Sequence, residues 1–353
     1  TPAFLDGMLT FRGNYTEAIR SPAVTELFLP QVQIGTFATD PCDERDIESG
    51  NNPAVRRANC EAAVAALSGT LEPGFSLDTF RAISANASQS AVTGGNPELA
   101  NERSSAYSMG IILTPDRFVP GLQVSFDYTE IDIEDAIVNL SATNILAACF
   151  DSPAYPNEPS CERFERDPVT FQPHDFITGF VNAAEVRFRG WTVQGNYGID
   201  LAKISGALNG SLNLSVNYFR TERNDQRVGA GDLDILVGSR GVEEDKFQTN
   251  ITYSLDRFTG MLQWRGDLGG FFSPNDIAAG NFESRDIQEF PSFHIFNLTL
   301  RYDLFEDSYI QAHVNNLFDE ENKPLRRAAT DSNSNLLDDV FGRRYLISVG
   351  TKF

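Results

Sequence analysis

Hydrophobic and polar residues alternate with a period of two along most of the chain. The last twelve residues place an apolar or β-branched side chain at every second position: Tyr345, Ile347, Val349, Thr351 and Phe353. The segments 208–227, 243–255 and 291–305 repeat this alternation. Because successive side chains of a strand point to opposite faces, the pattern predicts half-buried β-strands.

The alternation predicts ten strands in all. They span roughly 3–16, 102–114, 121–138, 181–199, 208–227, 243–255, 258–272, 291–305, 308–318 and 342–353. Two of them contain a phase slip, one between Tyr128 and Ile131 and one between Phe188 and Trp191. A slip of one residue turns the side chains to the other face, so we expect a β-bulge or a change of environment near each.

Short and long connections alternate strictly between these strands. The short ones are 115–120, 200–207, 256–257 and 306–307, and the long ones are 17–101, 139–180, 228–242, 273–290 and 319–341. A soluble β-sandwich gives no reason for this asymmetry, and long unstructured loops count against a compact soluble domain. Outer-membrane barrels have short periplasmic turns and longer extracellular loops. The sequence therefore predicts an all-β fold, an antiparallel up-and-down transmembrane β-barrel with the five long loops outside.

The two faces of the predicted strands fit this fold. One face is aromatic and aliphatic, as lipid requires, and the other carries Asn, Gln, Ser, Thr, Arg and Asp, as a wet lumen requires. Hydrophobic residues are only 41% of the 353 residues, which suits a wall in which alternate strand residues contact lipid. No apolar run approaches the roughly 20 residues of a helical span. No signal peptide is seen at Thr1, so an exported chain would be a mature chain or a piece of one.

The formal charge of −21 disfavours some classes of binding partner. Nucleic acid and a polybasic contact with anionic lipid are disfavoured, because both need an excess of Lys and Arg. We expect the acids to lie mostly in the extracellular loops and the lumen. One acidic cluster in the first long loop would attract a cationic ligand or, more simply, form a solvated loop: Asp40, Asp43, Glu44, Asp46 and Glu48.

Four cysteines form two local pairs, Cys42 with Cys60 and Cys149 with Cys161. A zinc site is the alternative, but the chain has no Cys-x-x-Cys spacing and no His close to either pair. We favour two disulfides within the long loops, which implies an oxidising compartment. The Ala-rich segment 52–68 is expected to form a short helix anchored by Cys60.

Several motifs together carry a family resemblance. They are Phe-Arg-Gly-Asn-Tyr-Thr-Glu-Ala-Ile-Arg-Ser-Pro at 11–22, Glu-Leu-Phe at 26–28, Gly-Asn-Pro-Glu-Leu at 95–99, Val-Asn-Asn-Leu-Phe-Asp at 314–319, and Gly-Arg-Arg-Tyr at 342–345 leading to Phe353. In this order the chain resembles the C-terminal part of the β-barrel of TonB-dependent outer-membrane receptors. One departure is Ala-Asn-Glu at 100–102, where the family more often has Lys-Pro-Glu.

The resemblance implies a 22-stranded barrel closed around an N-terminal plug. This chain would supply the last ten strands, and the plug, the TonB-contacting motif and the first strands would be absent. The implied partners are the TonB complex, reached through that absent region, outer-membrane lipid and lipopolysaccharide, and an extracellular small-molecule ligand. The implied location is the outer membrane of a Gram-negative bacterium.

Candidate ligand-contact residues are few. Trp264, Arg265, Phe271 and Phe272 lie near the upper end of a predicted strand, but an interfacial aromatic girdle and a polar lumen network explain them as well and are favoured. His313 is expected to face the lumen with Gln311 and Asn315 and is a further candidate. We expect the three histidines to sit in polar networks rather than to bind a metal.

Other motifs carry no chemistry. The segment 331–335 resembles the start of an EF-hand loop but fails at Leu336 and Gly342. Asn-x-Ser/Thr at Asn213, Asn250 and Asn297 arises from strand alternation. Because the chain has no P-loop, nucleophile elbow or His-Glu-x-x-His motif, no catalytic residue, resident metal or cofactor is predicted.

The leading hypothesis is energised uptake of a scarce solute: an iron chelate, a vitamin, a sugar or a peptide. The alternatives are a ten-stranded outer-membrane barrel enzyme and a passive porin or adhesin. Pairing of the first strand with the last would favour the small closed barrel, whereas two unpaired edges would favour the receptor.

Overall fold

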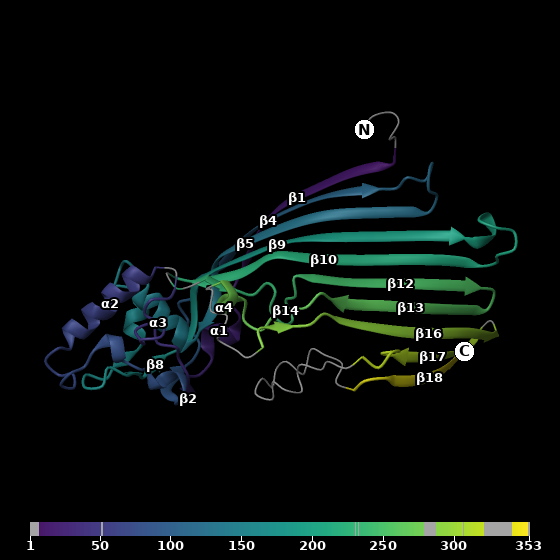
Figure 1. Cartoon of the computed structure of the whole chain (residues 1–353). Helices are drawn as coiled ribbons and strands as arrows, with labels where there is room; N and C mark the ends of the chain where they lie inside the picture. The colour runs from purple at the N-terminus through teal and green to yellow at the C-terminus, as the bar shows by residue number, and fades with distance from the viewer. Residues whose placement is uncertain are drawn as a thin grey trace.

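One antiparallel β-sheet dominates the structure, which is a computed structural model (Figure 1). It describes residues 7–50, 52–229, 231, 233–278, 287–305, 307–320 and 341–351. Ten strands follow one another in the sheet: β1 (Leu9–Arg20), β4 (Glu102–Leu113), β5 (Leu122–Leu140), β9 (Gly179–Asp200), β10 (Ser211–Val228), β12 (Asp245–Leu255), β13 (Phe258–Asp267), β16 (Phe293–Phe305), β17 (Ser308–Asn315) and β18 (Arg344–Thr351). The short β11 (Leu233–Ile235) pairs with β10 beside this path.

All ten predicted strands lie in this sheet in chain order, so the antiparallel up-and-down topology is confirmed. β1 and β18 are its edges: over the described residues β1 pairs with β4 alone and β18 with β17 alone. The short connections after β4 and β9 lie at one end of the sheet, and the long connections 21–101 and 141–178 lie at the other (Figure 1). No helix within the described ranges is long and apolar enough to span a membrane.

Several strand boundaries differ from the predicted ones; for example, β1 begins at Leu9 and not at residue 3, and β17 ends at Asn315 and not at residue 318. The first strand was expected to end at residue 16, but pairing with β4 continues to Arg20, opposite Glu102. The guanidinium of Arg20 forms ion pairs with Glu102 and Glu26, which hold this end of the strand together. The seventh strand was expected to reach residue 272, but β13 ends at Asp267. Gly269, at φ +82°, then turns the chain into the small pair β14 (Gly270–Phe271) and β15 (Glu289–Phe290).

The two faces of the sheet differ in chemistry as expected. On the face that we call the apolar face, aromatic rings of neighbouring strands contact one another, for example Tyr15 with Tyr107 and Phe126 with Trp191. On the polar face, Gln263 donates to Asn250 and accepts from Asn297, whose side-chain oxygen in turn accepts the backbone N–H of Asn316. These bonds join the polar side chains across β12, β13 and β16.

The phase slips mark a change of environment on the polar face. Ile131 and Ile133 lie on the same face as Asp127 and pair in register with Phe188 and Val186. A register shift follows between Ile133 and Ala136, where Asp135 has φ +54°. Near the second slip β9 itself has no shift, and the irregularity lies on β10 between Thr221 and Arg223. Beyond these points the polar face is covered by protein, which explains why its residues become apolar.

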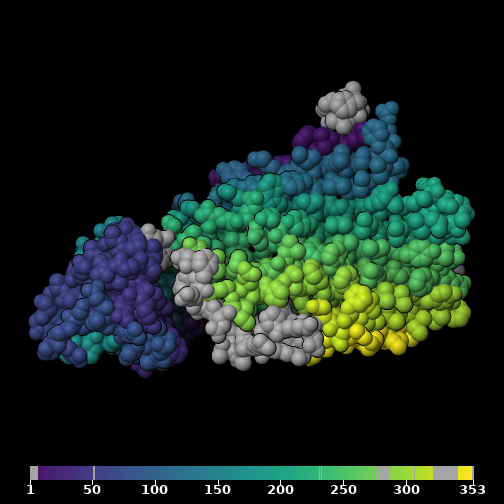
Figure 2. All heavy atoms as spheres, in the orientation of Figure 1, coloured from purple at the N-terminus to yellow at the C-terminus, as the bar shows by residue number. Residues whose placement is uncertain are grey.

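The cover is a small domain built from the first two long connections, residues 21–101 and 141–178, which we call the loop domain. Figure 2 shows it at the end of the sheet, coloured purple to teal. Its elements are α1 (Val24–Phe28), β2 (Val32–Thr36), α2 (Pro53–Ala66), η2 (Leu77–Thr79), η3 (Ile83–Ala85), β3 (Gln89–Thr93), α3 (Ala142–Phe150), η4 (Pro159–Arg163), β6 (Glu165–Arg166), β7 (Pro173–His174) and β8 (Phe176–Ile177). Outside it, η5 (Leu201–Lys203) lies in a short turn and α4 (Pro274–Ala278) in a long connection.

The loop domain has its own hydrophobic core. Phe150, Phe171 and Phe176 are buried there together with both disulfides, Cys42–Cys60 and Cys149–Cys161. The predicted disulfide pairs and the helix over 52–68 are thus confirmed. A second cluster joins this domain to the sheet, because Ile145 of α3 packs with Ala136, Ala184 and Val228.

Candidate ligand-binding surface

The acidic cluster of the first long loop is partly built into the fold: two of its five acids are buried, and Glu48 is exposed. Asp40 and Asp43 are each 1% exposed. Asp40 accepts two hydrogen bonds of 2.8 Å from Arg166, and Asp43 accepts two of 2.7 Å from Arg45. Although burial acts to raise the pKa of Asp43, the bonds from Arg45 and from backbone N–H groups lower it overall.

The remaining acids of this cluster also have arginine neighbours. Glu44 pairs with Arg81, and Glu48 with Arg57. The backbone oxygen of Asp46 accepts a 2.9 Å bond from Arg56. Arginines thus pair with the carboxylates of Asp40, Asp43, Glu44 and Glu48, so these four acids already have cationic partners within the protein.

The polar face instead carries a cationic pocket of about 510 Å³ near the ends of β12, β13, β16 and β18. Charged residues in its lining are Lys246, Arg265, Arg344, Glu243 and Asp267, and aromatic ones are Phe293 and Phe341. Among the lining residues that the structure describes, three bases and two acids sum to a formal charge of +1, whereas the whole chain carries −21. Such a pocket suits an anionic ligand with apolar or aromatic parts.

One acid of this pocket, Glu243, pairs with one of its bases. Glu243 forms an ion pair of 2.8 Å with Lys246 and accepts a 2.7 Å bond from the backbone N–H of Gly241. Burial acts to raise the pKa of Glu243, but these two bonds outweigh it and lower the pKa. Glu243 thus neutralises Lys246, while Arg265 is exposed and forms no hydrogen bond or ion pair with the residues that the structure describes.

Trp264 and Arg265, adjacent in sequence, lie on opposite faces. Arg265 pairs in register with Gln248 and Ile295 on the polar face. Trp264 lies on the apolar face, where its ring stacks on Phe296 at 5.8 Å and meets Phe247 edge-on at 4.6 Å. His294 also contacts this aromatic column, at 6.0 Å from Trp264. Strand alternation alone could have separated the two candidates.

The other predicted contact residues lie apart from Arg265. Phe271 is in β14, and the ring of Phe272 packs edge-on against Phe290. His313 lies on the polar face, where its Nδ1 is 2.7 Å from the hydroxyl of Thr299 and its Nε2 is 2.7 Å from the amide oxygen of Asn315. It thus has the polar surroundings expected for it.

A second pocket, of about 310 Å³, lies between α3 and the polar side chains of β10 and β11. Gln226 and Asn275 donate to the two carboxylate oxygens of Asp234, at 2.9 and 2.7 Å. Thr143 and Asn144 of α3 complete its polar wall. Sequence reasoning missed this site because its residues come from three separate connections.

The EF-hand-like segment at 331–335 lies outside the described residues.

An up-and-down antiparallel sheet with one aromatic face, one polar face and its described long connections at one end has the architecture of outer-membrane β-barrel proteins. The profile of the family described as TonB dependent receptor-like, beta-barrel, matches residues 3–317. The chain belongs to this family of TonB-dependent receptors.

Solved structures agree with this assignment. The siderophore receptor PirA from Acinetobacter baumannii matches with a TM-score of 0.55 at 14% identity, covering 98% of this chain and 39% of that one. A mutant of the ferric enterobactin receptor PfeA from Pseudomonas aeruginosa, in complex with enterobactin, matches with a TM-score of 0.53 at 14% identity and the same coverage. The chain thus spans 39% of the length of these receptors, and the likeness shows the fold. No curated protein matches the sequence.

Proposed function

We propose that this chain is part of an outer-membrane receptor that takes up an anionic iron chelate by TonB-energised transport. The single observation that carries the proposal is the cationic pocket on the polar face of a TonB-dependent receptor sheet. Many iron chelates are anionic, and an arginine beside aromatic rings binds such ligands through charge-assisted and stacking contacts. The siderophore receptors among the similar structures support this class of solute.

In this proposal the polar face lines the lumen of a 22-stranded barrel around a plug, and the loop domain faces the medium. The apolar face supports this orientation. Above the rings of Tyr128 and Trp191, charged pairs such as Glu130 with Arg189 replace aromatic side chains on the same face. An aromatic belt followed by charges is the pattern at the edge of an apolar band. Lipid and lipopolysaccharide would contact this face, and the TonB complex would energise release.

The unpaired edges of the sheet favour the receptor over the alternatives. A ten-stranded barrel enzyme would need β1 to pair with β18, yet over the described residues these strands pair with β4 and β17 alone. We therefore expect no catalytic activity from this sheet. Of the predicted contact residues, the proposal retains Arg265 and assigns Trp264 to the aromatic belt; Phe271, Phe272 and His313 remain candidates at the rim and in the lumen.

Growth on iron chelates tests the function. Cells that depend on this receptor are expected to grow on an anionic ferric chelate as sole iron source, and to stop growing when either the receptor gene or TonB is deleted. Uptake that persists without TonB would contradict energised transport and favour a passive porin. Growth on neutral chelates alone would contradict the proposed charge of the solute.

Reversing the charge of Arg265 tests the site. Arg265→Glu is expected to lower the affinity for the anionic chelate at least tenfold, because it changes the pocket from +1 to −1 and removes a planar donor. The measurement is binding of radioactive ferric chelate to cells at constant receptor level. Trp264→Leu is the matched control, since its side chain lies on the other face and its loss is expected to change affinity less than twofold. Equal losses in both variants would contradict this placement of the site.

A further inference from the structure

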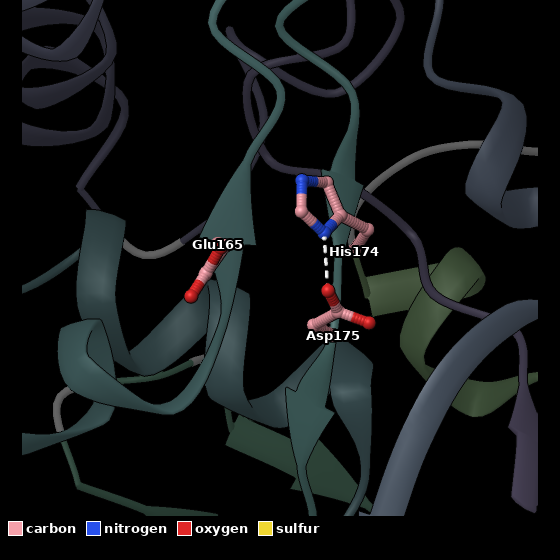
Figure 3. A group of neighbouring side chains, drawn as sticks. All are labelled: Glu165, His174 and Asp175. Carbon is pink, nitrogen blue, oxygen red and sulfur yellow. Dashed lines mark hydrogen bonds and ion pairs between the residues drawn. The ribbon is translucent and has the colours of Figure 1, made fainter.

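A separate group of ligand-type side chains lies on the hairpin β6–β7 of the loop domain. In this hairpin Glu165 pairs in register with His174 (Figure 3), and Arg166 pairs with Pro173. Side chains directly opposite each other on one face of an antiparallel pair lie about 5 Å apart at Cβ. Glu165 and His174 are therefore placed side by side by the backbone itself.

The opposite face of the hairpin fixes this pair in position. Arg166 points into the core, where its guanidinium binds both carboxylate oxygens of Asp40 and the backbone oxygen of Phe171 at 2.8 Å. It also lies 4.2 Å from the ring centre of Phe171. At the turn, the carboxylate of Asp167 accepts bonds from Val169 and Thr170. The hairpin is thus anchored on the side that faces the core of the loop domain, which limits the motion of Glu165 and His174.

The next residue, Asp175, turns back toward this pair. In a regular strand its side chain would point away from that of His174, but its φ of +48° breaks the alternation. An Asp tolerates this left-handed conformation better than most residues. Its carboxylate reaches the Nδ1 of His174 at 3.0 Å and also accepts a bond from the hydroxyl of Ser90 on β3. These two bonds, from Ser90 first and His174 second, lower the pKa of Asp175.

The three side chains offer one nitrogen and two oxygen ligands, and these atoms lie within 4.8 Å of one another. Ligands bound at 2.0–2.2 Å in a tetrahedron stand about 3.4 Å apart, so the side chains need to close by roughly 1 Å or a little more. Glu165 and Asp175 are exposed and His174 is partly buried, so rotation of the side-chain ends can supply this movement. The cation of Arg166 does not oppose a metal ion here, because Asp40 neutralises it.

We propose that Glu165, His174 and Asp175 form a binding site for a divalent transition-metal ion of the zinc and copper class. One imidazole nitrogen with two carboxylates favours such ions over Mg²⁺ and Ca²⁺, which prefer oxygen ligands alone. Three protein ligands leave further positions to water, as in zinc sites that bind a solvent molecule. Through Asp175 and Ser90 the bound ion would connect the β6–β7 hairpin to β3. The site is independent of the cationic pocket and of the proposed uptake function.

The test is metal binding by the whole chain in detergent micelles. Titration with Zn²⁺ in a calorimeter is expected to show one saturable site, and Cu²⁺ at one equivalent is expected to give an electron paramagnetic resonance spectrum with nitrogen coupling. His174→Gln is expected to lower the Zn²⁺ affinity at least tenfold and to abolish the nitrogen coupling, although His294 and His313 remain. Glu165→Gln and Asp175→Asn are each expected to lower the affinity at least tenfold with the coupling retained.

Glu162→Gln is the matched control, because it removes a nearby exposed carboxylate that lies outside the group. It is expected to change the affinity less than twofold. Equal unfolding midpoints of the metal-free variants establish that lost binding is not lost folding. Absence of a saturable site in the original chain, nitrogen coupling that survives His174→Gln, or equal losses in Glu162→Gln would each overturn the proposal.

Discussion

Replacing Arg166 by methionine is expected to lower the free energy of unfolding of the loop domain by about 3–5 kcal/mol, because the substitution leaves Asp40 buried without a counter-ion. The side chains of Arg166 and Asp40 are 6% and 0% exposed, so water cannot replace the lost partner. The measurement is pulse proteolysis in increasing urea, with fragments of the loop domain identified by mass spectrometry.

Two comparison variants separate the ion pair from general damage. Arg81→Met removes an ion pair whose arginine is 72% exposed, and its expected cost is at most about 1 kcal/mol. Adding Asp40→Asn to Arg166→Met removes the uncompensated charge and is expected to recover part of the loss. Equal costs for Arg166→Met and Arg81→Met would show that the buried pair does not hold the domain together.

Removing the disulfide Cys42–Cys60 by a double change to alanine is expected to cost about 3 kcal/mol, the chain-entropy value for closing a loop of this length. The bond joins residues 18 apart, and both sulfurs are fully buried in the core of the loop domain. Urea unfolding of the oxidised protein measures the effect. The second disulfide joins residues 12 apart, and its removal is expected to cost nearly as much.

Reduction supplies the control for the disulfide experiment. With thiol reductant throughout, the original chain is expected to lose stability, whereas a variant without any cysteine is expected to be unaffected. If the double alanine variant unfolded at the same urea concentration as the oxidised original chain, the disulfide would add nothing to this fold.

The sheet was predictable because lipid and water impose opposite demands on alternate residues. That alternation predicted every long strand. The two phase slips at Ile131 and Phe188 indicated where the polar face becomes covered. The loop domain was not predictable, because its contacts join distant residues: Arg56 and Asp151 are 95 residues apart, and Arg166 and Asp40 are 126 apart. One signal was overlooked. Ser141, whose hydroxyl accepts the N–H of Asn144, marks the start of α3 within the predicted loop 139–180.

The candidate sites, like the loop domain, depend on contacts between residues far apart in the sequence and were therefore only partly predictable. Arg265 was named from sequence, but its pocket also needs Lys246 and Arg344 from other strands, which no local pattern brings together. The sequence around His174 shows no spacing typical of a metal site. Glu165 lies beside His174 because of the hairpin pairing, and the carboxylate of Asp175 turns toward His174 because Asp175 has a positive φ. Local periodicity specifies which face a residue occupies. Its neighbours on that face are specified by turns and by ion pairs between residues far apart in the sequence.

The way in which the loop domain enters and leaves the sheet has a consequence for protein engineering. Its four chain crossings occur at the ends of β1, β4, β5 and β9, which are consecutive neighbours in the sheet. Both disulfides are internal to one connection or the other, so neither cross-links the domain to the strands. Two tight hairpin turns, one in place of each connection, could therefore replace the whole domain. The loop domain could then be inserted into two neighbouring hairpins of another β-sheet protein.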